Sequence, residues 1–186
     1  MHPLPNILTP GSDGTLVPEG LRCIRMANEP KLAHLNGEAL RWAQAGKAIP
    51  SFFELSTDDK KHEPPRLSVW IESLTTIAEA WTLVGANPKR NWVVFLHVDD
   101  VRKVCAPTID TFPVTPHLEV EWESAMTLSE SGERVPEMRD GWQGHAGIRN
   151  LDQGNKTQRE ALRWQLADIA IVQILGENEL SDYKHV

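Results

Sequence analysis

The stretch from Arg66 to Val104 constrains the fold more than any other part of the sequence. Two runs rich in β-branched and aromatic residues, 65–73 and 91–98, predict strands, and the second is apolar almost throughout, as is typical of a strand buried on both faces. Between them Thr76 and Glu79 have the spacing of a capping box, in which each side chain satisfies a backbone amide of the first helical turn. The stretch therefore predicts a strand, a helix and a second strand in succession.

Two further segments show the alternation of half-buried strands. Residues 21–26 alternate apolar and basic positions, which predicts a first strand with Arg22 and Arg25 on one face. Residues 117–123 alternate more regularly, with apolar side chains on one face and carboxylates on the other. The carboxylates are those of Glu119, Glu121 and Glu123, opposite Leu118, Val120 and Trp122. A shorter run at 51–55 predicts one more strand.

Two other helices are predicted from apolar residues at helical spacing. The first covers residues 29–45, with Asn28 as its N-cap. The second opens at another capping box, formed by Thr157 and Glu160, and is expected to run to Leu175. With the helix that follows Thr76, the chain has three expected helices.

The length of 186 residues is that of one domain with a substantial core. Residues 1–20, rich in proline and glycine, predict an extended N-terminal arm, and residues 177–186 a polar C-terminal tail. Residues 21–176 are expected to form a single α+β domain, in which about three helices pack on a mixed or mainly antiparallel β-sheet. The polar segments 56–65 and 124–154 are predicted to be loops, the first solvated and the second long and irregular.

Composition narrows the classes of function. Nineteen basic and 26 acidic residues give a net charge of −7, and a field of this sign repels phosphate backbones, so general nucleic-acid binding is not expected. The two cysteines, Cys23 and Cys105, predict free thiols in a reducing compartment. There is no signal peptide pattern, and no run approaches the roughly 20 apolar residues that span a bilayer. We therefore expect a cytoplasmic protein with no membrane partner, whose oligomeric state the sequence does not determine.

His145 is the most unusual local feature, because Gly141, Gly144 and Gly147 surround it. The glycines leave room for a ligand, and an imidazole suits proton transfer near neutral pH. The alternative is that the glycines only permit tight turns and that His145 has a structural hydrogen bond. No phosphate-binding loop, dinucleotide-binding glycine motif or serine-hydrolase motif is present in the sequence.

The histidines do not predict a metal site. No pair has the spacing of four residues that would place two ligands on one face of a helix, and the zinc motif His-Glu-x-x-His is absent. His97 and Asp99 alternate on a predicted strand, but such a spacing is common by chance. The carboxylates of 117–123 are likewise more typical of a solvated strand face than of metal ligands.

The order of the predicted elements resembles the core of ADP-ribosyltransferase-like domains, which bind NAD. It comprises a strand with Arg22, a strand with Ser68, a helix, the apolar strand 91–98 and a later acidic strand. The resemblance implies that Arg22 holds the dinucleotide, that Ser68 lines the nicotinamide pocket, and that either Glu121 or Glu123 is the catalytic acid. It covers residues 21–123 as an order of elements with single residues in common.

Two hypotheses of function follow. The first is an acidic protein-interaction module, such as an inhibitor, immunity-type protein or accessory subunit, which needs no cofactor and binds a basic protein partner through exposed tryptophans beside an acidic patch. The alternative is an NAD-using transferase or glycohydrolase with Arg22, Ser68 and a strand glutamate in one cleft. A deep polar cleft with convergent titratable groups favours the second.

Overall fold

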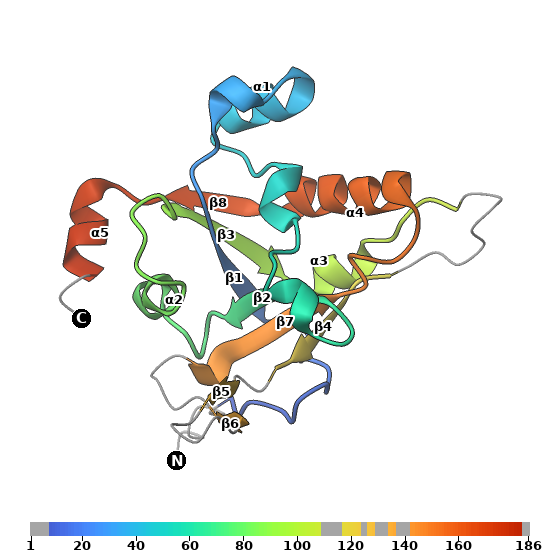
Figure 1. Cartoon of the computed structure of the whole chain (residues 1–186), viewed down its shortest axis with the longest axis vertical. Coiled ribbons are helices and arrows are strands. Elements are labelled where there is room, and N and C mark those ends of the chain that lie inside the picture. The colour runs from blue at the N-terminus through green and yellow to red at the C-terminus, as the bar shows by residue number, and fades with distance from the viewer. Residues whose placement is uncertain (1–7, 109–116, 124–125, 129–133, 137–141, 184–186) are drawn as a thin grey trace, which may run out of the picture.

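The fold is built on a six-stranded sheet in which each neighbouring pair is antiparallel, in the order β4-β7-β2-β1-β3-β8 (Figure 1). The computed structural model describes residues 8–108, 117–123, 126–128, 134–136 and 142–183. The strands of the sheet are β1 (Arg22–Ala27), β2 (Arg66–Ile71), β3 (Trp92–His97), β4 (Glu119–Trp122), β7 (His145–Arg149) and β8 (Ile171–Ile174). Two short strands, β5 (Met126–Leu128) and β6 (Arg134–Pro136), pair with each other in a separate two-stranded sheet.

Helices lie on both faces of the sheet. In the described residues the α-helices are α1 (Gly37–Gln44), α2 (Ile77–Leu83), α3 (Val98–Lys103), α4 (Lys156–Ile169) and α5 (Glu177–Tyr183). The short 3-10 helices are η1 (Leu32–His34), η2 (Pro50–Phe53), η3 (Asp59–Lys61) and η4 (Trp142–Gly144). This is the predicted α+β class, with more helices than the three expected.

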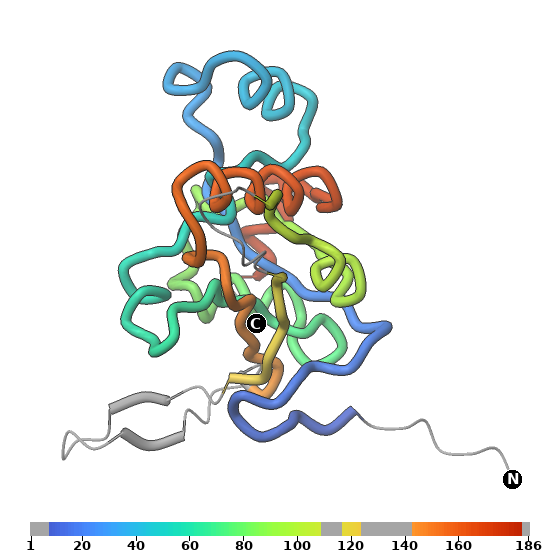
Figure 2. The backbone as a smooth tube through the Cα atoms, turned by 90° about the vertical axis from the view of Figure 1, so that its right-hand side faces the viewer, coloured from blue at the N-terminus to red at the C-terminus, as the bar shows by residue number. Residues whose placement is uncertain are grey.

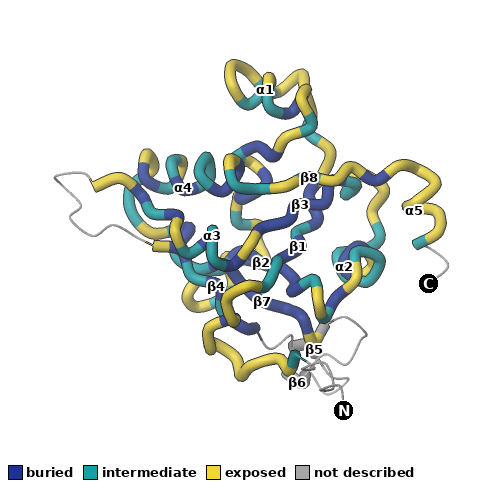
Figure 3. Tube along the Cα trace, turned by 180° about the vertical axis from the view of Figure 1, so that it is seen from behind, coloured by how far each residue is buried: buried dark blue, intermediate teal, exposed yellow. Residues whose placement is uncertain are grey.

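Each face of the sheet is covered by an apolar core of its own. On the first face, side chains such as Leu67 and Val94 join a large cluster with Leu162 of α4 and Val101 of α3. On the second face, β1 and β3 contribute apolar side chains to a smaller cluster with α2 and α5. The members from the strands are Ile24, Met26, Val93 and Phe95, together with Trp70 of β2. Figure 3 shows the central strands buried between these layers.

The strand, helix and strand predicted between Arg66 and Val104 are confirmed as β2, α2 and β3. Thr76 and Glu79 form the capping box at the start of α2, with the Glu79 amide donating to Thr76 Oγ1 at 3.2 Å. Five consecutive residues of β3, from Trp92 to Leu96, are buried, as expected for a strand covered on both faces. The sequence is most informative where local signals and burial agree.

Three predictions of local structure are wrong. The helix expected over 29–45 is divided into η1 and α1, because Gly37 has a φ of +53° at the start of α1 and does not continue a helix. The strand expected at 51–55 is η2, which begins at a proline. The helix expected to reach Leu175 ends at Ile169, and Ile171–Ile174 pairs with β3 as the edge strand β8.

The capping box of the last long helix also differs from the prediction. It consists of Asn155 and Gln158 instead of Thr157 and Glu160. The Gln158 amide donates to Asn155 Oδ1 at 2.9 Å, and the Asn155 amide donates to Gln158 Oε1 at 3.0 Å. Both pairs have the same spacing, so the sequence alone does not choose between them.

The ends of the described chain are more ordered than their compositions suggest. The N-terminal arm pairs with the β4 edge, where the Val17 amide donates to the Val120 carbonyl and the Trp122 amide donates to the Thr15 carbonyl. The segment expected to be a polar tail contains α5, whose Leu180 is buried in the second-face core. Helix α1 lies at one end of the molecule above α4, where Trp42 packs edge-on against Trp164 (Figures 1 and 2).

Candidate functional site

The sheet splits between its two central strands. Strand β1 pairs with β2 only at Cys23 and Ile24, although it pairs with β3 along all six of its residues. Beyond Ile24 the two strands separate, and the Ser68 amide of β2 donates to Asp59 Oδ1 at 3.0 Å instead of to β1. A split between two buried strands leaves backbone groups and side chains facing a shared space.

A cavity of about 880 Å³ lies at this split. This volume is within the range of small-molecule binding sites, about 300 to 1,000 Å³. Residues from both sides of the split line it, including Arg25 and Met26 of β1 and Ser68 and Trp70 of β2. The other titratable side chains that line it are Asp13, Glu29, Lys31, Glu54, Asp58, Asp59, His62, Arg66, Arg90, Glu123 and His145.

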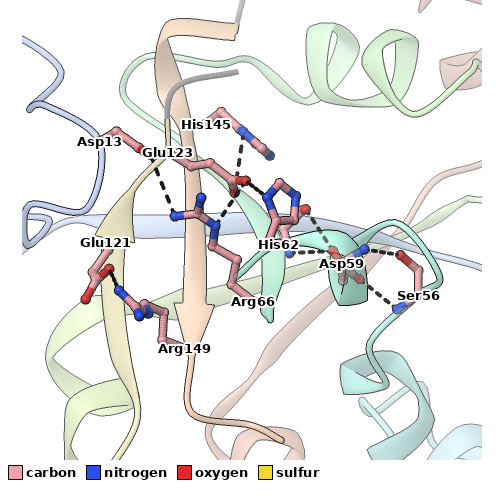
Figure 4. A network of polar contacts seen from close by, with 10 residues as sticks. Asp13, Ser56, Asp59, His62, Arg66, Glu121, Glu123, His145 and Arg149 are labelled. Atoms are coloured by element: carbon pink, nitrogen blue, oxygen red, sulfur yellow. Dashed lines mark hydrogen bonds and ion pairs between the residues drawn. The ribbon is translucent and has the colours of Figure 1, made fainter. Parts of the chain in front are cut away.

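Glu123 is a buried acid that lines the cavity (Figure 4). It follows the last residue of β4, and its amide donates to the carbonyl of His145 at 3.1 Å, which fixes the backbone beside β7. Its side chain is 1% exposed and lies 3.0 Å from His62 Nδ1 and 3.1 Å from Arg66 Nε. Burial raises the pKa of Glu123 to about 7, because the loss of hydration outweighs the attraction of Arg66. The prediction of a solvated carboxylate at this position is therefore wrong.

His145 lies at the start of β7 and not in an irregular loop, so the predicted loop over 124–154 is wrong at this point. The residue pairs with Trp70 of β2, and the two rings lie 5.7 Å apart. Its Nδ1 is 3.7 Å from Glu123 Oε2. Burial, with the nearby charges of His62 and Arg66, lowers the pKa of His145 to about 3, so the ring is neutral at physiological pH.

Arg66 reaches the cavity by crossing over Gly147. A methyl group at Gly147 would lie 2.8 Å from Arg66 Cδ and 3.1 Å from its Cβ and Cγ, so a larger residue would displace the arginine. The guanidinium lies between Glu123 and Asp13, with its Nη1 3.7 Å from Asp13 Oδ1 (Figure 4). Gly147 thus has a packing role that composition alone does not indicate. Asp13 is the residue that the N-terminal arm supplies to the cavity.

A second buried carboxylate, Asp59, fixes the other side of the cavity. Asp59 Oδ1 accepts hydrogen bonds from the amide and the hydroxyl of Ser68 at 3.0 and 2.8 Å. Burial alone would raise its pKa, but the charge of Arg25 and hydrogen bonds from Ser56 and Ser68 hold the pKa of Asp59 below its ordinary value. The segment 56–65 is therefore anchored at Asp59, contrary to the prediction of a solvated loop.

The structure brings three of the five predicted site residues to this cavity. Ser68, Glu123 and His145 line it. Arg22 and Glu121 do not: Arg22 pairs with Glu72 and lies over the Phe95 ring, and Glu121 pairs with Arg149. Of the two glutamates that the sequence left open, only Glu123 lines this cavity.

The position of Arg22 follows from strand geometry. Arg22 and Arg25 are three residues apart, so alternation places them on opposite faces of β1, and the prediction that they share a face is wrong. The Arg25 guanidinium donates to the carbonyls of Phe52 and Ser68, each at 2.8 Å. Arg25 is thus the arginine of the first strand that lines the cavity.

Sequence reasoning did not assign Asp59, His62, Arg66 or Arg25 to the site. The first two lie in a charged segment whose composition is typical of a loop, and their burial depends on contacts with β2 and β4 that are distant in sequence. A usable signal existed for Arg66, because it begins a strand and alternates with Ser68 on the same face.

The described residues include no group of three or more His, Cys, Asp or Glu side chains placed to hold a metal ion. Within the same residues, no helix combines the length and the apolar composition needed to cross a bilayer. Comparisons with known proteins add no assignment: no family model, no curated protein and no solved structure matches the chain.

Proposed function

We propose that the protein is an NAD-using transferase or glycohydrolase whose active site is the cavity between β1 and β2. One observation carries the proposal: the split of the sheet collects an arginine of the first strand, a serine of the second and a buried glutamate of a later strand. These are Arg25, Ser68 and Glu123. The ADP-ribosyltransferase-like resemblance implies these residue types in this chain order, with Arg25 in place of Arg22.

The chemistry of the cavity suits the cleavage of an N-glycosidic bond. The nicotinamide group leaves the ribose with the bonding electron pair, and the ribose carbon acquires the character of an oxocarbenium cation. A buried carboxylate stabilises such a cation more strongly than a solvated one, because little water screens the charge. We assign this role to Glu123, whose carboxylate acts on the cation electrostatically from the wall of the cavity, and its ionised form is the active one.

Other groups of the cavity support binding of a dinucleotide. Four cations line the cavity beside six carboxylates, and of these cations we assign Lys31 and Arg90 to the phosphate groups. The largely buried Trp70 contributes aromatic surface to the lining, which suits contact with a flat heterocycle. Asp59 and Arg25 hold the Ser68 segment through its amide, hydroxyl and carbonyl, so this wall of the cavity is rigid before a ligand binds.

The interaction-module hypothesis stays a prediction with less support. It requires exposed tryptophans, yet among the tryptophans whose side chains the structure describes none is exposed. Trp70, Trp81, Trp92 and Trp122 are buried, and Trp42 and Trp164 are half-buried. A polar cavity with convergent titratable groups instead favours the enzyme.

The test is the release of nicotinamide from NAD, detected by mass spectrometry, for the wild-type protein, Glu123→Gln and Glu121→Gln. We expect the rate of the Glu123→Gln variant to fall at least about 100-fold. This is the effect of removing from an enzyme one group that stabilises charge in the transition state. Its affinity for NAD should remain within about tenfold, because the lost interaction acts mainly in the transition state.

The Glu121→Gln variant is the matched control, since both glutamates lie on the same face at the end of β4 but only Glu123 lines the cavity. It should keep a rate close to that of the wild type. Equal losses in the two variants would remove the assignment of Glu123, and a wild-type protein that neither binds NAD nor releases nicotinamide would contradict the proposal as a whole.

A further inference from the structure

His62 combines contact with the buried acid and access to the cavity. Its Nδ1 lies 3.0 Å from Glu123 Oε1, and its side chain is 31% exposed. The side chain of His145, the other imidazole near this carboxylate, is only 7% exposed. Both histidines line the cavity, and His62 is the more exposed of the two. Figure 4 shows that both lie beside Glu123.

The position of His62 is set by buried contacts. It directly follows η3, whose first residue is the buried Asp59. The Ser56 amide donates to Asp59 Oδ2 at 2.8 Å, and Ser68 donates to Asp59 Oδ1 from its amide and its hydroxyl. These bonds tie the segment that carries His62 to β2.

We propose that His62 is a catalytic residue that accepts the proton of the nucleophile attacking the ribose. This assignment rests on the proposed function and names the base of that same site. The charged and titratable groups of the lining include Glu123, Arg66 and His145, and the carboxylates of Asp13, Asp58 and Asp59 also line the cavity. Glu123 lies on the Nδ1 side of the imidazole.

The step balances without a further reactant. The bond between the ribose carbon and nicotinamide breaks, and nicotinamide leaves as a neutral molecule with the electron pair. The oxygen of a water molecule, or of another hydroxyl acceptor, bonds to the ribose carbon, and its proton passes to the imidazole of His62. Glu123 stabilises the imidazolium through Nδ1, and the proton then passes to solvent.

His62→Gln and His62→Ala test the assignment in the nicotinamide-release assay, with NAD as substrate and water as acceptor. We expect the rate of the His62→Gln variant to fall at least about 100-fold, because a general base typically accelerates a reaction by at least about this factor. Its dissociation constant for NAD should stay within about threefold of the wild-type value, because glutamine remains polar but cannot take the proton. Imidazole added to the solution should raise the rate of the His62→Ala variant about tenfold, because it can enter the space left by the side chain and act as the base.

His97→Ala is the matched control, because His97 is exposed at the end of β3 and does not line the cavity. Its rate should equal that of the wild type. If the wild type is active and His62→Gln keeps a similar rate, the role of His62 is overturned and the proposed function stands. If His62→Ala loses NAD binding and imidazole restores nothing, His62 has a structural role only. A wild-type protein that releases no nicotinamide overturns both proposals.

Discussion

The second face of the sheet has an apolar half and a polar half that follow the same strand alternation. In the apolar half, Ile24 of β1 and Phe95 of β3 pack beneath α2 and α5. In the polar half, Ser68 of β2 is paired with Gly147 of β7, and His145 of β7 is paired with Trp70 of β2. Glu123 follows β4 on the same face. The boundary between the halves lies near the split between β1 and β2, where Trp70 of β2 belongs to the apolar cluster and also lines the cavity.

The comparison indicates what each half contributes. Removing apolar area from the first costs stability, because close packing supplies much of the folding free energy. The second half retains a buried carboxylate whose ionisation opposes folding, and such a cost is typical of functional sites. Substitution in the apolar half should therefore lower the free energy of unfolding, whereas neutralising the buried carboxylate in the polar half should raise it.

The largest effect is expected at Trp81 of α2, which is fully buried in the apolar half. Trp81→Ala should lower the free energy of unfolding by about 3 to 5 kcal/mol, since it leaves a large void in the core. The loss should be similar at acidic and basic pH, because no ionisable group is removed. Urea denaturation followed by circular dichroism measures it.

Trp81→Phe is the control for this variant. It fills most of the space but removes the hydrogen bond from the indole Nε1 to the Asn87 carbonyl, which is 3.1 Å long. Its loss should be smaller than that of Trp81→Ala. A loss below about 1 kcal/mol for Trp81→Ala would mean that the second-face core does not hold α2 on the sheet.

A smaller effect of opposite sign is expected at Glu123. The pKa of its carboxyl is raised from 4.5 to about 7, so between these pH values the unfolded chain ionises while the folded protein keeps its proton. Wild-type stability is therefore lost as the pH rises from 4.5 to about 7, by up to about 3 kcal/mol, and this penalty persists at higher pH.

Glu123→Gln, which mimics the neutral acid, should consequently be more stable than the wild type at about pH 8 and nearly equal to it at about pH 4. Denaturant unfolding at both pH values measures the difference. Glu121→Gln serves as the control because Glu121 is paired with Arg149. A Glu123→Gln protein that is less stable than the wild type at the higher pH would show that the ionised carboxylate is held by favourable contacts, in conflict with the raised pKa.

The same two halves differ in how much of their structure can be predicted from the sequence. In the apolar half, β3 and α2 were predictable because an apolar run and a capping box act locally and agree with burial. In the polar half, the alternation of 117–123 correctly gave the faces of β4, but it could not show that Glu123 is buried while Glu121 pairs at the edge of the site. That difference arises from Arg66 and His62, which are distant in sequence.

The split between β1 and β2 was not predictable for a related reason. Pairing partners of a strand depend on the whole sheet, and the residue that replaces β1 beside Ser68 is Asp59, within a segment of loop composition. Gly147 illustrates the same limit: its role is to let Arg66 cross β7, which becomes apparent only when β2 and β7 are adjacent.

The most direct measurement is a crystal structure of the protein with an NAD analogue whose bond between ribose and nicotinamide cannot be cleaved. We predict that the nicotinamide ring lies beside Trp70 and Ser68, that the ribose carbon lies next to the Glu123 carboxylate, and that the phosphate groups lie toward Lys31 and Arg90. An analogue that binds outside the cavity, or a cavity that stays empty of it at millimolar concentration, would contradict the account.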